Sequence, residues 1–381
     1  MRILHIDTGA GWRGGQQQVL WLMEALRARG CEQWLLAPAD SPLAARVRRA
    51  GLEVAELALP AMSWANLGIV RNARAVSDIV HAHDARAHSL AAIAAVGAPG
   101  PPRPLVVSRR VAFPVGPFGL LKYSRADAYI AVSDYVRQRL LDARVPAGKI
   151  RVIFDGVPPP SVGSSEEDRA AFRARHGADQ QTFLFGTLTS LAPEKLLEAE
   201  LDLLAELPPS VQLWMAIPAA ERAEGAESAL REHARSRGVE QRFRIIALDE
   251  NAGPFLAALD VFVYLSKLEG LGSAILLAMA HGLPVVASRV GGIPEIVRHE
   301  ETGLVAGPNP GPDLAEAARR LIESPDLRRR LGAAARAFVL DHASCDKMAA
   351  QTAAVYEELL QGKLESEPRP IRPARRDQGR P

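Results

Sequence analysis

Short apolar runs alternate with helical patterns along the first half of the chain. The run at residues 3–6 predicts a buried strand, and a glycine-rich loop at residues 9–15 follows it. The next segment predicts a helix, because apolar residues from Val19 to Leu26 recur at the spacing of one helical face. Further strands are expected at residues 34–37, 54–57, 79–83, 105–107 and 129–132. Strands separated by helices of about 10–15 residues indicate right-handed parallel βαβ units.

A second alternating series follows a break in the pattern. Residues 158–168 are rich in proline, glycine and serine, which is typical of an interdomain linker. A final helical stretch is expected to run to about residue 361. Later strands are expected at residues 183–186, 212–216, 243–246, 261–265 and 284–287, and helices at 272–281 and 313–323. The pattern predicts an α/β protein with two Rossmann-like, doubly wound domains.

Composition limits the class of protein. The 381 residues are enough for two domains of ordinary size. A net charge of +2 provides no field for nucleic acid, so no nucleic-acid partner is expected. The two cysteines, Cys31 and Cys345, lie far apart, which argues against a disulfide framework or a zinc site and fits a reducing cytoplasm.

Both ends of the sequence bear on its location. The first residues begin a strand pattern without the layout of a signal peptide. No apolar run approaches the roughly 20 residues that span a bilayer. Residues 362–381 are rich in arginine and proline and predict a disordered tail, which either stays solvated or touches anionic lipid. We expect a cytoplasmic protein whose membrane contact, if any, is peripheral and at the inner face.

The loop that contains Gly14 and Gly15 is the first candidate site. Glycines let a backbone approach an anion closely, and the helix that follows offers unpaired N–H groups. A tight turn explains the same glycines equally simply. The loop departs from the G-x-G-x-x-G dinucleotide fingerprint, which makes an oxidoreductase less favoured.

The second candidate is the segment of residues 81–88, directly after a strand. It holds His81, His83, Arg86 and His88, and ligands of open α/β sheets gather at the carboxyl ends of strands. Three interpretations stay open: substrate contact, an ordinary polar loop, and a metal site. For the metal site, His81 and His83 would share one face of a strand, but the sequence identifies no third ligand.

The third candidate is the pair Arg109 and Arg110, which follows another strand. Cations next to aromatic residues in this segment fit an anionic or lipid-linked acceptor. A solvated loop before a core helix explains the pair equally well.

The fourth segment, residues 266–295, carries the strongest signal. Its pattern is strand, glycine loop, buried helix, glycine stop, strand, and a second glycine loop. Gly270 and Gly272 present backbone N–H groups at a helix N-terminus. Glu269 lies at the mouth of the loop, where its carboxylate accepts hydrogen bonds from sugar hydroxyls or simply caps the helix.

These motifs together resemble one known family. The run from Glu269 to Glu295, with Gly14–Gly15 and residues 132–133 and 154–157, is similar to the retaining family-4, or group 1, glycosyltransferases of GT-B fold. The resemblance implies two Rossmann-like domains that face each other across a cleft. The N-terminal domain is expected at residues 1–160, with a returning helix at about 345–361 added to it. The C-terminal domain is expected at residues 170–344, and a tail follows at 362–381.

The resemblance also implies roles for particular residues. The glutamate that matches Glu269 contacts the donor sugar, and the histidine that matches His83 lies near the transferred sugar and the acceptor. Lys195 matches a lysine that neutralises the diphosphate. The remaining donor-binding residues are Gly14, Gly15, Gly270, Leu271, Gly272 and Ser273, and the acceptor-side candidates are Arg86, Arg109 and Arg110.

Three positions depart from the family pattern. Leu277 replaces a second glutamate that binds the ribose, Ser190 replaces an arginine, and Leu196 replaces a glycine. Each lost charge-assisted contact is worth roughly 1.5–3 kcal/mol, so donor binding without compensation would weaken about a hundredfold or more.

The sequence therefore predicts transfer of a sugar from a nucleoside diphosphate to a hydroxyl with retention. We expect no cofactor and no metal. The acceptor is expected to carry a hydroxyl group, either free or on a lipid carrier, and the reaction to serve cell-surface polysaccharide or lipopolysaccharide synthesis. Two alternatives stay open. One is a catalytically silent binding partner of the same fold, and the other is a UDP-sugar epimerase.

Overall fold

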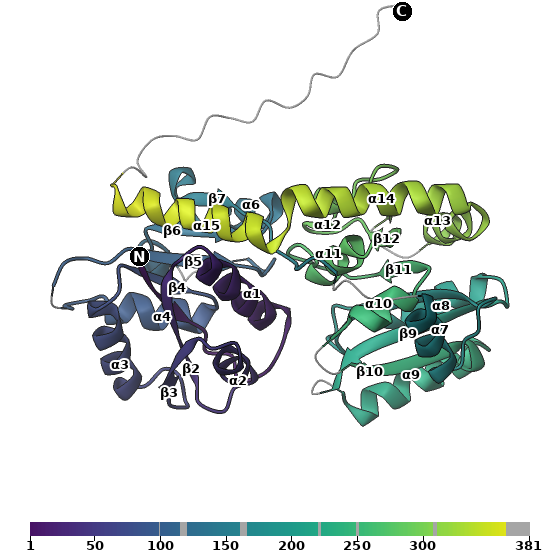
Figure 1. Cartoon of the computed structure of the whole chain (residues 1–381), viewed down its shortest axis with the longest axis horizontal. Coiled ribbons are helices and arrows are strands. Elements are labelled where there is room, and N and C mark those ends of the chain that lie inside the picture. Colours follow the sequence, from purple (N-terminus) through teal and green to yellow (C-terminus); the bar gives the residue numbers. More distant parts are fainter. Residues whose placement is uncertain are drawn as a thin grey trace, which may run out of the picture.

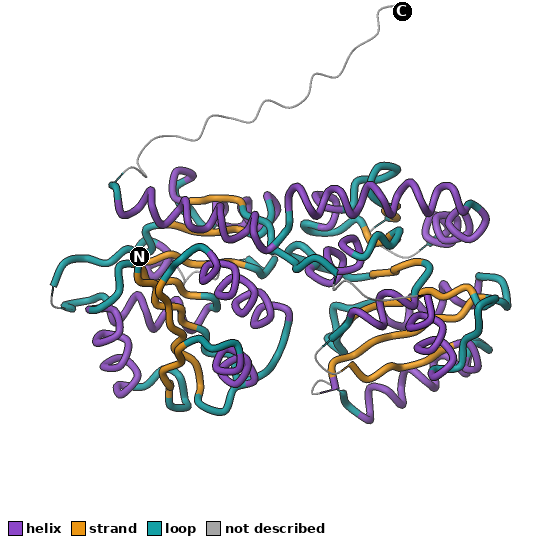
Figure 2. Tube along the Cα trace, in the orientation of Figure 1, coloured by secondary structure: helices purple, strands orange, loops and turns teal. Residues whose placement is uncertain are grey.

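The computed structural model of the chain describes residues 1–98, 100–114, 120–160, 166–219, 222–248, 251–307 and 311–362. Two α/β halves lie side by side, each built on its own sheet (Figure 1). The strands of each sheet lie between layers of helices (Figure 2). This architecture confirms the expected fold class of two Rossmann-like, doubly wound units.

The first sheet has seven parallel strands in the order β3-β2-β1-β4-β5-β6-β7. They are β1 (Arg2–Ile6), β2 (Glu32–Pro38), β3 (Glu53–Leu57), β4 (Ile79–Ala82), β5 (Leu105–Arg109), β6 (Ala128–Ala131) and β7 (Ile150–Val152). The strand order reverses between β1 and β4. In sheets of this kind, ligands bind outside the carboxyl ends of the strands at such a reversal.

Helices cover both faces of the first sheet because its strands are apolar on both sides. Ile3 and Leu22 belong to one buried cluster, whereas Leu4 and Leu90 belong to another on the opposite face. One face carries α1 (Gly14–Ala28), α2 (Pro42–Arg49) and α15 (Cys345–Leu360), and the other α3 (Trp64–Ala75) and α4 (Ala85–Ala94). The remaining helices of this half are α5 (Leu120–Tyr123) and α6 (Asp134–Asp142).

The second sheet has six parallel strands in the order β10-β9-β8-β11-β12-β13 and reverses between β8 and β11. They are β8 (Phe183–Leu188), β9 (Val211–Pro218), β10 (Phe243–Leu248), β11 (Val261–Tyr264), β12 (Val285–Ser288) and β13 (Leu304–Ala306). Its helices are α7 (Glu166–Arg175), α8 (Leu197–Glu206), α9 (Glu224–Ser236), α10 (Gly253–Ala258), α11 (Ser273–Ala280), α12 (Ile293–Ile296), α13 (Pro312–Glu323) and α14 (Pro325–His342).

The last helical stretch of the chain consists of two helices. α14 ends at His342, and Ser344 caps α15 by accepting the backbone N–H of Lys347 at 3.2 Å. The segment between them pairs with Val157, which precedes the second sheet. α14 contacts α11, and α15 contacts α1, so the chain crosses between the halves at this break (Figure 1).

Two expected segments fall partly outside the described residues. Of the linker at 158–168, residues 158–160 lack regular structure, residues 161–165 lie outside, and α7 begins at Glu166. The expected tail lies outside from residue 363 onward.

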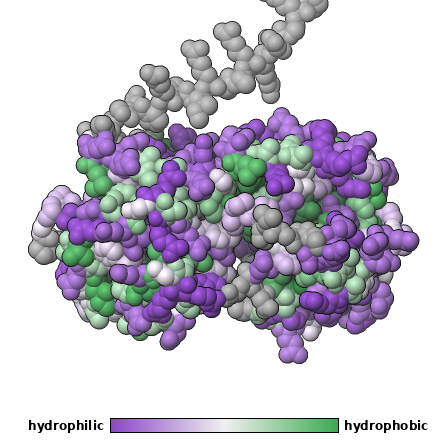
Figure 3. Space-filling model, viewed as in Figure 1, coloured by the Kyte–Doolittle hydropathy of each residue, from purple (hydrophilic) through white to green (hydrophobic). Residues whose placement is uncertain are grey.

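Hydrophobic residues appear on the surface as small groups among hydrophilic ones (Figure 3). The most exposed large apolar side chains in the described ranges include Trp64, which is 90% exposed, with Leu59 and Met62 close to it in sequence. None of the described helices combines the length and the apolar character that a membrane span requires.

Candidate functional site

The two halves meet where the glycine loop before α11 abuts the first sheet. A Cβ atom on Gly270 would lie 2.2 Å from the carbonyl oxygen of Arg110, so only glycine allows this approach. The Ser133 hydroxyl donates to the carbonyl oxygen of Gly270 at 2.6 Å. From the other side, the Glu295 carboxylate accepts the backbone N–H groups of Asp134 and Tyr135, at the start of α6, at 2.7 and 2.8 Å. Both glycine-rich turns of the segment 266–295 therefore lie at the interface between the two halves.

Asp155 joins residues of both halves at this boundary. Its carboxylate accepts from Arg110 Nε at 2.9 Å and from the Ser273 hydroxyl at 3.2 Å. Gly272 precedes Ser273 in the left-handed region, with φ of 106°, and sets the direction in which α11 begins. Sequence reasoning gave Asp155 no role, although it lies in the 154–157 stretch that carries part of the resemblance.

The start of α1 connects to the same place. Gln18 accepts the backbone N–H of Gly156 at 3.1 Å, and Gly156 follows Asp155. Chains of contacts therefore run from α1 through residues 155–156 to the start of α11. No described atom lies within 4 Å of a Cβ placed on Gly14 or Gly15, and no described side chain caps this helix. A helix N-terminus of this kind favours an anion.

Lys195, Tyr264 and Glu269 form a compact polar cluster in the second half. Lys195 Nζ donates to Tyr264 Oη and to Glu269 Oε2, both at 2.6 Å, and Tyr264 Oη donates to Glu269 Oε2 at 2.7 Å. The Lys195 and Glu269 side chains are only 12% and 18% exposed. Lys195 follows β8 and Glu269 follows β11, so the cluster lies at the reversal point of the second sheet.

The contacts of Glu269 decide whether it caps the helix that follows. The other carboxylate oxygen of Glu269 accepts the N–H of Gly270 at 3.2 Å, and α11 begins at Ser273 without a side-chain cap. Glu269 is therefore not a cap of α11. Tyr264 was missed because it ends a fully buried apolar strand, where the sequence predicts only core packing.

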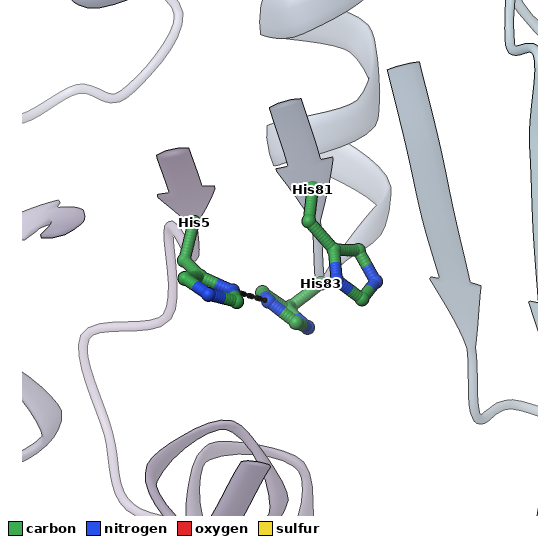
Figure 4. A group of neighbouring side chains, drawn as sticks. All are labelled: His5, His81 and His83. Atoms are coloured by element: carbon green, nitrogen blue, oxygen red, sulfur yellow. Dashed lines mark hydrogen bonds between the residues drawn. The ribbon is translucent and has the colours of Figure 1, made fainter. Parts of the chain in front are cut away.

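Three histidines meet at the reversal point of the first sheet (Figure 4). His5 on β1 lies opposite His81 on β4, and His83 follows β4 directly. His5 Nδ1 and His83 Nε2 are hydrogen-bonded at 2.9 Å, and the His81 and His83 ring centroids are 4.1 Å apart. His81 binds the hydroxyl of Tyr356 at 2.6 Å and that of Ser108 at 2.8 Å.

Burial keeps these imidazoles neutral. Desolvation lowers the pKa of His5 to about 4, and it lowers the pKa values of His81 and His83 well below their ordinary value. The Arg110 charge lowers the pKa values of His81 and His83 further.

The metal interpretation gains a third ligand, since His5 supplies what the sequence did not identify. Nitrogen atoms of His5, His81 and His83 lie within 4.8 Å of one another. The Arg110 charge opposes a bound cation there as it opposes a proton, because both place positive charge in the same buried volume. Hydroxyl groups also occupy both nitrogens of His81. The environment thus favours a neutral polar cluster over a divalent ion.

The remaining arginine candidates differ in their surroundings. Arg86 is exposed in the first turn of α4. Arg109 is buried, and its terminal nitrogens donate to the Tyr123 hydroxyl at 2.5 Å and to the carbonyl of Phe113. An acceptor would reach Arg109 only by displacing these contacts.

The positions that depart from the family pattern carry no compensating charge among the described contacts. Leu277 on α11 packs against the apolar core. Ser190 is half-buried after β8, and its carbonyl accepts from the Thr189 hydroxyl at 3.3 Å. Arg289 is exposed.

Comparisons with known proteins add family and fold to this geometry. N-acetyl-alpha-D-glucosaminyl L-malate synthase of Bacillus anthracis is 32% identical over 122 residues, which is 32% of this chain and 32% of that protein. D-inositol 3-phosphate glycosyltransferase of Streptomyces bingchenggensis is 35% identical over 207 residues, 51% of this chain and 45% of that protein. The chain thus spans less than half the length of these two curated relatives.

A solved structure extends the likeness to nearly the whole chain. Anabaena HepE, in complex with UDP and glucose, superimposes with a TM-score of 0.83 at 22% identity and covers 94% of this chain and 100% of that one. An identity this low establishes the fold alone. That shared fold is the GT-B architecture expected from the sequence.

Family models match both halves. Residues 12–159 match the model described as Glycosyltransferase Family 4, and residues 168–338 match the model described as Glycosyl transferases group 1. Both models describe glycosyltransferases, which agrees with the enzyme class expected from the sequence. The two adjoining matches, on a GT-B fold, support a group 1 glycosyltransferase.

Proposed function

We propose that this protein transfers a sugar from a nucleoside diphosphate donor to a hydroxyl acceptor with retention of anomeric configuration. The observation that carries the proposal is the Lys195–Glu269 pair beside the start of α11, at the reversal point of the second sheet. It offers a cation and helix amides for a diphosphate, and a carboxylate for a sugar, within one site. The UDP and glucose bound to HepE on the same fold support this donor class.

The proposed chemistry depends on stabilising the leaving group. As the bond to the sugar breaks, the diphosphate gains negative charge, which Lys195 Nζ and the backbone N–H groups of α11 and α1 stabilise. Lys195 exchanges the Glu269 carboxylate for the diphosphate when the donor binds. Glu269 is then free to accept hydrogen bonds from sugar hydroxyls, while the Tyr264 hydroxyl keeps the carboxylate in place.

These protein groups supply the charge stabilisation that a metal ion provides in other enzymes, so we propose catalysis without a metal. Chelation by EDTA is expected to leave turnover unchanged. The proposed donor contacts further include Gly14, Gly15, Gly270, Leu271, Gly272 and Ser273.

The acceptor side is proposed to lie on the first domain, near His83, Arg86 and Arg110. A hydroxylated acceptor on a lipid carrier fits the exposed Trp64, because this amphipathic side chain favours a membrane interface. We propose a peripheral position at the cytoplasmic face of a membrane and a role in the synthesis of surface polysaccharide or lipopolysaccharide.

A thermal-shift screen tests the donor assignment. Ligands that bind the folded state stabilise it by RT ln(1 + [L]/Kd), so millimolar UDP, GDP, UDP-glucose and GDP-mannose are suitable probes. We expect at least one nucleoside diphosphate to raise the unfolding midpoint, and slow release of nucleotide from its sugar by the wild type but not by Glu269→Ala. No shift with any nucleotide or nucleotide sugar would contradict the proposal.

Leu277 and Ser190 favour one second candidate, a glycosyltransferase fold that binds its ligands without turnover. Removal of a ribose-binding carboxylate and a phosphate-binding arginine lowers donor affinity. Nucleotide binding with an equal, near-zero rate in the wild type and in Glu269→Ala would support this candidate over catalysis.

A further inference from the structure

A one-way hydrogen-bond chain leads from the backbone to His83. The Met23 carbonyl can only accept, so the Gln33 amide nitrogen must be the atom that faces it at 2.5 Å. The Gln33 oxygen therefore faces His5 Nε2 at 3.0 Å, and His5 Nε2 must carry a proton to donate to it. Gln33 and His5 are 7% and 0% exposed, which leaves solvent little part in this chain.

The same logic fixes the protons on His83. Because His5 is neutral and protonated on Nε2, its Nδ1 carries a lone pair. The hydrogen bond of 2.9 Å to His83 Nε2 then requires the proton to lie on His83 Nε2. Neutral His83 is left with a lone pair on Nδ1, at the side of the ring away from His5 (Figure 4).

His83 Nδ1 is buried and has no hydrogen-bond partner among the described residues. A buried lone pair of this kind is costly unless a donor meets it. The Arg110 charge lowers the pKa of His83, and the terminal nitrogen Nη1 of Arg110 is also buried without a described partner. A hydroxyl can donate its proton to the His83 lone pair, whereas a phosphate oxygen would face that lone pair with another.

We propose that Gln33 and His5 are positioning residues that fix the tautomer of His83, so that His83 Nδ1 accepts a hydrogen bond from a hydroxyl of the transferred sugar. The identity of the hydroxyl as part of a sugar rests on the proposed glycosyltransferase function. The His83 tautomer follows from the hydrogen-bond chain alone, so an experiment can contradict the sugar contact without contradicting the tautomer.

Nitrogen-15 NMR of the histidine rings reads the tautomer without any ligand. In protein labelled on its nine histidines, with the His83 signals identified by their loss in His83→Ala, we expect a protonated Nε2 and an unprotonated Nδ1. Gln33→Met removes the acceptor of His5 and is expected to produce a mixture of His83 tautomers. A proton on Nδ1 in the wild type would overturn the inference.

Two substitutions at position 5 separate positioning from packing. His5→Leu removes the acceptor for His83 Nε2, whereas His5→Asn places an amide oxygen close to the position of Nδ1 and is expected to restore the tautomer. Ser77→Ala is the matched control, because it removes a different hydrogen bond of a buried side chain, from Ser77 to the carbonyl of Ala73, just before β4 begins.

Calorimetry of UDP against UDP-glucose, and of GDP against GDP-mannose, tests the sugar contact. In His5→Leu we expect the sugar nucleotide to bind about tenfold more weakly with the diphosphate unchanged, as the loss of one hydrogen bond predicts. In Gln33→Met we expect a smaller loss of sugar-nucleotide affinity, because part of His83 keeps the competent tautomer. Ser77→Ala and His5→Asn should keep the wild-type ratio. If the ratio of sugar-nucleotide affinity to diphosphate affinity is unchanged in all variants, the sugar contact is overturned. If no diphosphate binds at all, the proposed function is contradicted instead. Stoichiometric zinc in the wild type, lost in His83→Ala, would assign the lone pair to a metal.

Discussion

Replacing Lys195 with methionine removes the cation from a mostly buried pair. Lys195 Nζ lies 2.6 Å from Glu269 Oε2, and the loss of one partner from a buried ion pair costs about 3–5 kcal/mol. Tyr264 Oη and the Gly270 N–H still donate to the carboxylate, so we expect Lys195→Met to lower the free energy of unfolding by about 2–3 kcal/mol. Adding Glu269→Gln to this variant removes the unpaired charge and should restore part of that loss.

The same substitution tests the diphosphate contact. A charge-assisted contact of about 1.5–3 kcal/mol predicts that Lys195→Met binds UDP or GDP about ten- to hundredfold more weakly. Glu269→Gln is the informative counterpart, because it releases Lys195 from its partner. It should bind the free diphosphate at least as tightly as the wild type and lose the preference for the sugar nucleotide.

Urea denaturation measures the first effect and isothermal titration calorimetry the second. Diphosphate affinity within twofold of the wild type in Lys195→Met would refute the assignment of Lys195 to the leaving group. Weaker diphosphate binding in Glu269→Gln would refute the proposed exchange of partners.

Three further substitutions test other parts of the account. Burial, and next the Asp84 charge, raise the pKa of Asp7 to about 6 from 3.8. The folded state therefore binds an extra proton between these pH values, and the free energy of unfolding falls by about 3 kcal/mol as pH rises through them. Asp7→Asn should flatten this pH dependence of stability in urea titrations at pH 4 and 7, and an unchanged pH dependence would contradict the shift. Gly270→Ala places a Cβ atom against the Arg110 carbonyl and should cost about 1–3 kcal/mol in thermal unfolding, whereas Gly225→Ala has open space and should be nearly neutral; equal costs would count against a tight interface. Trp64→Ser should change stability by no more than about 0.5 kcal/mol yet reduce sedimentation with phosphatidylglycerol vesicles, and equal sedimentation would remove the membrane contact.

The fold was largely predictable because buried parallel strands are continuous apolar runs in the sequence. The two strands that were missed, β7 and β13, contain only three residues each, which is too short for a pattern to stand out.

The candidate site was predictable only where its residues are close in sequence. Glu269 and the glycines that follow it form one continuous segment, which the pattern identifies directly. His5 and Gln33 contact their partners across 78 and 28 residues, and His5 belongs to a strand that predicts only a core position. Their place beside His83 depends on the pairing of β1 with β4 and β2, which no local pattern encodes.

A crystal structure of the protein with a non-hydrolysable UDP-sugar or GDP-sugar analogue tests the central claim most directly. We predict that the diphosphate lies within hydrogen-bond distance of Lys195 Nζ and of backbone N–H groups at the starts of α1 and α11, with the sugar between Glu269 and His83. A nucleotide bound away from this boundary, with Lys195 still paired to Glu269, would contradict the account.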